Sequence, residues 1–152
     1  MSYTIRDANH SDILDITLAG KQFSKETNHP ALNTLNLNKV ANSLQQLIDS
    51  DVGFVKVSCF KEEIVGAIAA VAMELPINDL ICTQELMLWL DPEHRNGKTA
   101  PKLIDAYVEW AKGLGCDYAR LSALDCVLDG RAGVLFKRKG FKPIETAYIK
   151  EL

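Results

Sequence analysis

The stretch ELMLWLDPEHRNGKTAPKLI, residues 85–104, decides the fold of this chain. Its first residues belong to a predicted strand, 81–91, which Pro92 ends because proline cannot continue a ladder of hydrogen bonds. From Ala100 onward the apolar side chains recur on one face of a predicted helix. A strand that turns into a helix here presents the first N–H groups of the helix, which can bind an anion.

The turn contains the triplet Gly97-Lys98-Thr99, which also ends nucleotide-binding P-loops. A P-loop requires another glycine five residues before Gly97, and Pro92 occupies that place. The sequence therefore argues against a P-loop. Two interpretations stay open: a helix start that binds a different phosphate, with Arg95 and Lys98 adding charge, and an ordinary turn with solvated charges.

The patterns on both sides of this turn predict a single α/β domain over residues 1–152. Helices are expected from Ser11 or Asp12 onward and over 37–49, 100–115 and 129–140, with strands over 3–8, 53–60, 64–74, 81–91, 116–124 and 141–152. Residues 27–38 are expected to form a loop. The helix 100–115 permits a parallel crossover, while the earlier strands form a meander, so we expect a mixed, mostly antiparallel sheet with flanking helices.

Composition narrows the classes of protein to which this chain can belong. The formal net charge is −3 and no basic stripe is present, which argues against nucleic acid as a partner. No signal sequence or membrane-length apolar run occurs, so we expect a cytoplasmic protein with no membrane partner. The cysteines form no CxxC pair, which argues against a metal site and favours free thiols: Cys59, Cys82, Cys116 and Cys126.

Three motifs resemble those of the GCN5-related N-acetyltransferase (GNAT) superfamily. Family members carry a strand ending in Pro, then Arg-x-x-Gly-x-[Gly/Ala] and a helix with Leu-Ile, as in LWLDPEHRNGKTAPKLI, 88–104. A later helix of the family ends in [Tyr/Phe]-x-x-x-Gly-Phe, as in FKRKGF, 136–141, and YTIRDANHSDILDI, 3–16, resembles the family's opening strand and helix. The resemblance implies a sheet with a splayed parallel strand pair. It also implies direct transfer of an acetyl group from acetyl-CoA to a primary amine, without a metal.

The resemblance further implies how coenzyme A would bind. Its pyrophosphate would lie on the turn formed by Arg95, Asn96, Gly97, Lys98, Thr99 and Ala100. The backbone N–H of Leu90 would contact the acetyl group. Lys98 departs from the family pattern, because the usual central glycine stands one place earlier, at Gly97. Phe136 departs too: it replaces a cofactor-site tyrosine that is thought to protonate the departing thiolate.

Candidate catalytic residues follow from the needs of the reaction, which requires a base for the amine and stabilisation of an oxyanion. Glu85 is the candidate base, because a carboxylate among apolar strand neighbours would have a raised pKa if it were buried. The alternative is a solvated carboxylate on the outer face of the strand. Tyr148 is the candidate acid in place of Phe136, since Tyr107 and Tyr118 are expected to be structural. Ser122 and Asp125 could line the cleft.

The acceptor cannot be identified from the residues. We expect a small-molecule or peptide amine, bound by residues 27–38 and the C-terminal segment. The basic run Lys137 to Lys139 either complements its helix dipole or contacts the 3′-phosphate of CoA. A non-catalytic acyl-CoA-binding or protein-interaction module of the same fold is the alternative function, and a homodimer is left open.

Overall fold

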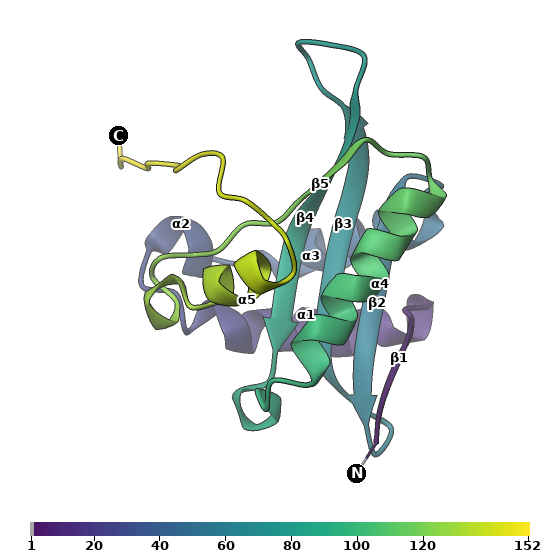
Figure 1. Ribbon diagram of the computed structural model, residues 1–152. Helices are drawn as coiled ribbons and strands as arrows, with labels where there is room; N and C mark the ends of the chain where they lie inside the picture. The colour runs from purple at the N-terminus through teal and green to yellow at the C-terminus, as the bar shows by residue number, and fades with distance from the viewer. Residues whose placement is uncertain (1) are drawn as a thin grey trace.

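The computed structural model describes residues 2–152 and contains one five-stranded sheet with the order β1-β2-β3-β4-β5 (Figure 1). The strands are β1 (Tyr3–Asp7), β2 (Gly53–Phe60), β3 (Glu63–Glu74), β4 (Ile81–Leu90) and β5 (Tyr118–Arg120). Neighbours from β1 to β4 pair antiparallel, and only β4 and β5 pair parallel. The expected mixed, mostly antiparallel sheet is confirmed.

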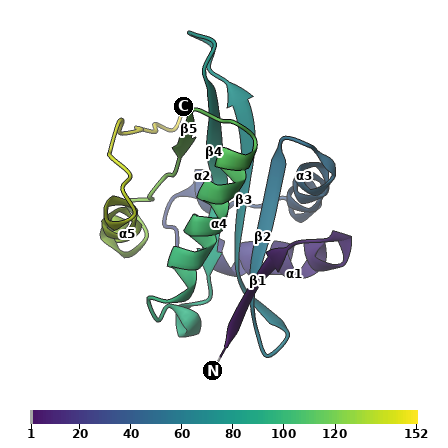
Figure 2. The ribbon, with the colours of Figure 1, turned by 45° about the vertical axis from the view of Figure 1, so that its right-hand side comes forward.

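Helices cover both faces of this sheet. Helices α1 (Ile13–Ser24) and α3 (Leu37–Asp49) lie on one face, and α4 (Thr99–Gly113) crosses the other (Figures 1 and 2). Each face has its own apolar cluster: Ile16 and Leu44 pack on the first, and Leu103 and Tyr107 pack on the second. The shorter helices are α2 (Pro30–Asn33) and α5 (Ala132–Arg138), with 3-10 turns η1 (His10–Asp12), η2 (Pro92–His94) and η3 (Leu128–Gly130).

The first helical segment begins at His10, before the expected start at Ser11 or Asp12. Asn9 caps η1, because its side chain accepts the Ser11 N–H at 2.9 Å. Asp12 completes a capping box by accepting the Asn9 N–H at 2.9 Å, while Arg6 binds the same carboxylate at 2.7 Å. The hydrogen bonds from Arg6 hold the pKa of Asp12 below its ordinary value.

Three predicted segments differ from the observed ones. The strand predicted over 116–124 pairs only from Tyr118 to Arg120, and the predicted loop 27–38 contains the short helix α2. The predicted C-terminal strand over 141–152 is wrong, since no strand forms there. Gly140 turns the chain with a φ of +90°, and Pro143 has no N–H to donate to a ladder. The segment extends beside α5 as a tail, yellow in Figure 1.

Candidate active site

Strands β4 and β5 separate in the middle of β4. Their parallel pairing begins at Cys82 with Tyr118 and ends at Gln84 with Arg120, while β4 continues to Leu90. A bulge lies just beyond this point: Glu85 pairs with Ala70 of β3 and Met87 pairs with Ala69, so the intervening Leu86 is an extra residue. The separation of the two strands after Gln84 is the expected splay.

The backbone of Leu90 faces this gap. Asp91 donates its N–H to the carbonyl of Val65 in β3 at 2.8 Å. Successive N–H groups of a strand point to opposite sides, so the Leu90 N–H points away from β3 and towards the side where β5 has ended. A polarised carbonyl seated in the gap could accept this N–H.

Glu85 lies at the point of separation and is only 9% exposed. Its partner Ala70 packs in the cluster beneath α4, which places the carboxylate on the α4 face of the sheet, near Tyr107. Burial raises the pKa of Glu85 to about 7, and the backbone N–H of Ser122 partly offsets that increase. The premise of a buried carboxylate with a raised pKa is therefore confirmed, and the solvated alternative is wrong. Its catalytic role stays a prediction.

The hydroxyl of Tyr107, a residue of α4, links β4 to β5 where the two strands separate. It accepts a hydrogen bond from Thr83 Oγ1 at 2.8 Å and donates to the carbonyl of Arg120 at 2.7 Å. Burial raises the pKa of Tyr107 to about 12, so the hydroxyl stays protonated. Tyr107 is fully buried, which agrees with its expected structural role.

The turn before α4 has the geometry of an anion site. Gly97 carries the left-handed backbone of the turn, with a φ of +78°, whereas Lys98 has an ordinary φ of −105°. The displaced glycine therefore stands where the turn needs it, and Lys98 is not strained. Asn96 accepts the Lys98 N–H at 3.0 Å, and Tyr3 fixes Asn96 by accepting its side-chain N–H at 2.9 Å.

Elimination leaves two backbone donors at the start of α4. The Lys98 N–H is bound to Asn96, and Pro101 has no N–H. Among residues 2–152, no acceptor is found for the N–H groups of Thr99 and Ala100. The Thr99 hydroxyl is also buried without a hydrogen-bond partner. A helix start with two free N–H groups and an unpaired hydroxyl suits an anion.

Arg95 is engaged differently from what the resemblance implies. Its guanidinium forms two hydrogen bonds of 2.7 Å with Glu26, from the segment that follows α1. Its Nε donates to the Leu90 carbonyl at 2.9 Å. This charge is neutralised inside the protein, so the side chain connects the turn to α1 and to the end of β4.

The remaining candidates are spread more widely. Phe136 is buried in α5 and packs against Phe141 at a ring-centroid distance of 6.3 Å. Tyr148 lies in the C-terminal tail and is 93% exposed, without a hydrogen bond to the cleft. In the basic run, Lys139 forms an ion pair with Asp105 of α4 at 2.5 Å, while Lys137 is exposed. The sequence did not reveal the roles of Glu26 and Tyr3, because Glu26 lies in no motif and the opening-strand motif does not show that Tyr3 contacts the turn.

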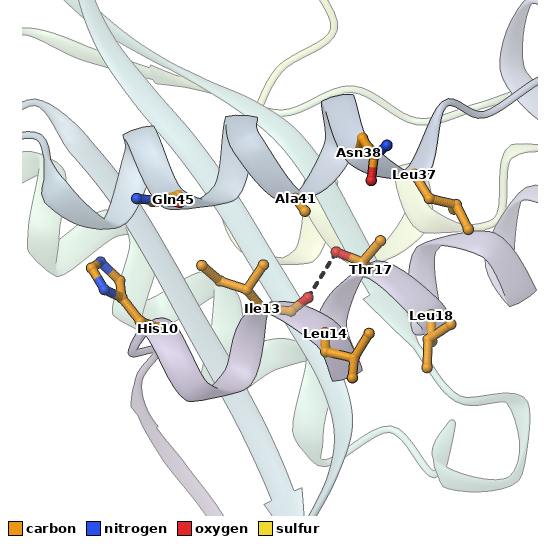
Figure 3. Close-up of a pocket in the computed structure, with 9 residues that line it drawn as sticks. All are labelled: His10, Ile13, Leu14, Thr17, Leu18, Leu37, Asn38, Ala41 and Gln45. Atoms are coloured by element: carbon orange, nitrogen blue, oxygen red, sulfur yellow. Dashed lines mark hydrogen bonds between the residues drawn. The ribbon is translucent and has the colours of Figure 1, made fainter.

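A separate hollow of about 430 Å³ lies between α1 and α3 (Figure 3). Leu14, Leu18 and Leu37 line it, with His10 at one end. It opens on the face of the sheet opposite α4, so it does not include Glu85 or the turn before α4. In the described part of the chain no cluster of three metal-ligating side chains occurs, and none of its helices is long and apolar enough to cross a membrane.

Known proteins resemble this chain in sequence and in fold. The model of the acetyltransferase (GNAT) family matches residues 21–141. A search among curated proteins found no significant match.

Solved structures show the same fold at low sequence identity. A ribosomal-protein-alanine N-acetyltransferase from Brucella melitensis has a TM-score of 0.78 at 15% identity, with 100% of each chain covered. A predicted acetyltransferase with acetyl-CoA from Clostridium acetobutylicum has a TM-score of 0.80 at 16% identity, covering 99% of this chain and 96% of that one. A glucosamine-6-phosphate N-acetyltransferase from Arabidopsis thaliana has a TM-score of 0.77 at 13% identity, covering 99% of each.

Proposed function

This chain belongs to the GNAT family of acetyltransferases, and we propose that it transfers the acetyl group of acetyl-CoA directly to a primary amine. The observation that carries the proposal is the buried Glu85 at the point where β4 and β5 separate. A carboxylate there can take a proton from an amine, and the anion turn lies at the other end of the same gap. Family membership alone does not identify the acceptor, since two of the neighbours named above are described as acting on different amines, a ribosomal-protein alanine and glucosamine-6-phosphate.

The residues present fit coenzyme A. The free N–H groups of Thr99 and Ala100, together with the unpaired Thr99 hydroxyl, would bind its pyrophosphate. Gly97 keeps the turn open for close approach, with no atom within 4 Å of its missing Cβ. Lys98 is exposed and adds positive charge, whereas Arg95 acts through the position of the turn because Glu26 occupies its guanidinium. When bound, acetyl-CoA supplies the activated acetyl group.

Glu85 would act as the general base. A pKa of about 7 leaves this carboxyl half ionised near neutral pH, where it can accept a proton from an ammonium group directly or through water. The Leu90 N–H would stabilise the negative charge that develops on the carbonyl oxygen, because it points into the gap and has no partner in β3.

Neither Phe136 nor Tyr148 is placed to donate a proton to the departing sulfur. Phe136 has no acidic proton to give. Tyr148 could reach the cleft only if the C-terminal tail moved onto it, since its side chain is 93% exposed. We therefore propose Glu85 as the principal catalytic residue and treat Tyr148 as the residue to be tested.

Calorimetric titration with CoA, followed by thiol release with an amine panel, tests the proposal. The panel should contain a peptide with an N-terminal alanine, an amino-sugar phosphate, an aminoglycoside and a polyamine. CoA binding with thiol release would support it. Tight CoA binding without release for any amine would favour the non-catalytic alternative, and saturable ATP binding without CoA binding would contradict both.

Dephospho-CoA is the matched ligand for the basic run in α5. If dephospho-CoA binds more weakly than CoA, the 3′-phosphate is contacted by the protein, with Lys137 as the candidate contact. If the two ligands bind equally, the basic run only complements the dipole of its helix. A cytoplasmic location and a homodimer stay predictions, for cell fractionation and sedimentation to test.

A further inference from the structure

The hydroxyl of Tyr107 bridges β4 and β5 at the place where the two strands part. It accepts a hydrogen bond from Thr83 Oγ1 at 2.8 Å and donates one to the Arg120 carbonyl at 2.7 Å. A hydroxyl carries one proton, so the donation from Thr83 leaves that proton for Arg120. Arg120 is the last residue of β5 and pairs with Gln84, where the ladder ends. The bridge therefore holds β5 at the end of its pairing with β4.

This bridge is formed in a buried setting. Tyr107 and Thr83 are both fully buried, and Tyr107 packs in the apolar cluster beneath α4. Removal of the hydroxyl would leave Thr83 Oγ1 and the Arg120 carbonyl without this partner, and a buried polar group without a partner is unfavourable. Because Arg120 is half-buried, its carbonyl would turn towards solvent and the residues after it would move.

The residues after Arg120 supply the hydrogen bond to the candidate base. The Ser122 N–H donates to the Glu85 carboxylate and lowers the pKa of that group against the larger effect of burial. Ser122 lies beyond the end of β5, so the ladder does not fix it. The Gln84 amide reaches Ser122 Oγ only at 3.4 Å, whereas the bond from Tyr107 to Arg120 is 2.7 Å long. The Tyr107 hydroxyl is therefore the firmer anchor for this stretch.

The groups around the Glu85 carboxylate give it no ionic partner. Tyr107 from α4 is neutral, because burial raises its pKa to about 12. Cys82, also on β4, is a buried thiol whose pKa is raised by burial. The guanidinium of Arg120 pairs with Glu145 in the tail, and β3 places an alanine opposite the carboxylate. Within residues 2–152, burial and the N–H from the extension of β5 are thus what act on this carboxylate.

We propose that Tyr107 is a positioning residue of the acetyl-transfer site, whose hydroxyl anchors the chain at Arg120 so that the Ser122 N–H reaches the Glu85 carboxylate. The proposal rests on the function proposed above and deepens it. Tyr107 contacts no reacting atom; it acts through Arg120 and Ser122. Without the hydroxyl, the carboxylate stays buried and loses its N–H donor. Its pKa then rises, and a smaller fraction is ionised near neutral pH to take a proton from the amine.

The variant Tyr107→Phe tests this role, because it removes the hydroxyl and keeps the ring. The pKa of Glu85 is measured by carbon-13 NMR of its side-chain carboxyl, which needs neither acetyl-CoA nor an amine. We expect this pKa to rise by about 0.5–1 pH unit, because the donor that lowers it is lost. Phe54→Leu is the control, since Phe54 packs against the ring of Tyr107 at a centroid distance of 6.2 Å and forms no hydrogen bond. In this control the pKa of Glu85 should be unchanged.

Thr83→Val is a second variant, in which valine keeps the shape of threonine. It removes the donor that orients the Tyr107 hydroxyl but leaves the hydroxyl in place, so the pKa of Glu85 should rise by a smaller amount. Thermal unfolding shows which variants are folded. An unchanged pKa in Tyr107→Phe, or in Thr83→Val if only that variant folds, would overturn the proposal. The position of Ser122 would then be set by the packing of Leu121 against the cluster beneath α4.

Kinetics give the second readout. In Tyr107→Phe the midpoint of the rise of kcat/KM with pH should move up by the same amount, so that kcat/KM at pH 6 is about three- to tenfold lower than in wild type. A raised pKa with an unchanged midpoint would also overturn the proposal, because the carboxylate that Tyr107 positions would not govern transfer. Failure of the proposed function would appear separately, as wild-type protein that does not bind CoA.

Discussion

Arg95 and Glu26 form a two-pronged ion pair, with both hydrogen bonds 2.7 Å long, between the anion turn and the segment after α1. The Nε of Arg95 reaches the Leu90 carbonyl as well. One side chain thereby connects the expected pyrophosphate turn, the last residue of β4 and a segment that borders the expected acceptor region. The geometry of the turn depends on a contact that its own sequence does not contain.

Replacement of Glu26 by Gln should therefore affect both stability and CoA affinity. The two side chains are about one quarter exposed, so loss of the charged partner should lower the free energy of unfolding by about 1–2 kcal/mol. CoA should bind several-fold more weakly, because Arg95 no longer holds the turn. Thermal unfolding and calorimetry measure these effects. Glu93→Gln, in the exposed η2 turn, is the control, and equal behaviour of the two variants would contradict the coupling.

Substitution of Glu85 by Gln should remove the base without disturbing CoA binding. We expect kcat to fall about 100-fold, which is the lower range for general-base catalysis. In wild type the rate should rise with pH around a midpoint near 7, as the carboxyl ionises, and this midpoint should be missing in the variant. Rates between pH 5 and 9 with a fixed amine check this. Retention of the midpoint would assign it to another group.

The same variant should change how stability depends on pH. The pKa of Glu85 rises from 4.5 to about 7 on folding, so the folded state binds its proton more tightly than the unfolded state does. Wild-type stability should then decrease as pH rises from 4.5 to 7, by about 2–3 kcal/mol. Glu85→Gln should lack this decrease and be the more stable protein at pH 8. Denaturant titrations at pH 4.5, 6 and 8 would refute the buried carboxylate if both proteins gave parallel curves.

Gly97→Ala should weaken CoA binding through the backbone of the turn. A φ of +78° is unfavourable for alanine, and the strain should cost about 1 kcal/mol and raise the Kd for CoA several-fold. Gly113→Ala is the matched control, because Gly113 ends α4 with open space around it and no positive φ. It should raise stability by about 0.5–1 kcal/mol with CoA affinity unchanged. Equal CoA affinity in both variants would dissociate the turn from the cofactor.

Tyr148→Phe should leave kcat within about twofold of wild type, since proton donation by a positioned side chain would contribute at least 100-fold. The hydroxyl is in an exposed tail and has no contact with Glu85 or Leu90. Steady-state kinetics at saturating acetyl-CoA provide the measurement. A large decrease in kcat would show that the tail folds onto the cleft and would establish Tyr148 as the proton donor.

Local patterns predicted most of the framework correctly. Apolar spacing identified α3 and α4, strand alternation identified β2, β3 and β4, and Pro92 marked the end of β4. The strand predicted over 141–152 does not form: Gly140 turns the chain with a φ of +90°, and Pro143 has no N–H to donate to a ladder.

The residues of the candidate site were likewise predicted only in part from the sequence. Glu85 was conspicuous as a carboxylate among apolar strand residues, but the sequence left open whether it is buried or solvated, and the structure shows it buried. Gly97 was recognised as displaced, yet only its φ of +78° shows that the displacement suits the turn. Gln84 stands next to Glu85 in the sequence without any sign that its amide donates a hydrogen bond to the Glu85 carbonyl.

The sequence by itself determined the order of the main strands and long helices up to α5, the family motifs and the carboxylate at the centre of β4, because these depend on neighbours a few residues away. Only the tertiary structure decided that Arg95 binds Glu26, 69 positions distant, and that Tyr3 fixes Asn96 from 93 positions away. It also decided where β4 and β5 part. Such contacts depend on how α1, β1 and α4 pack around the sheet, and the partner of a polar side chain is set by that packing rather than by its place in the chain.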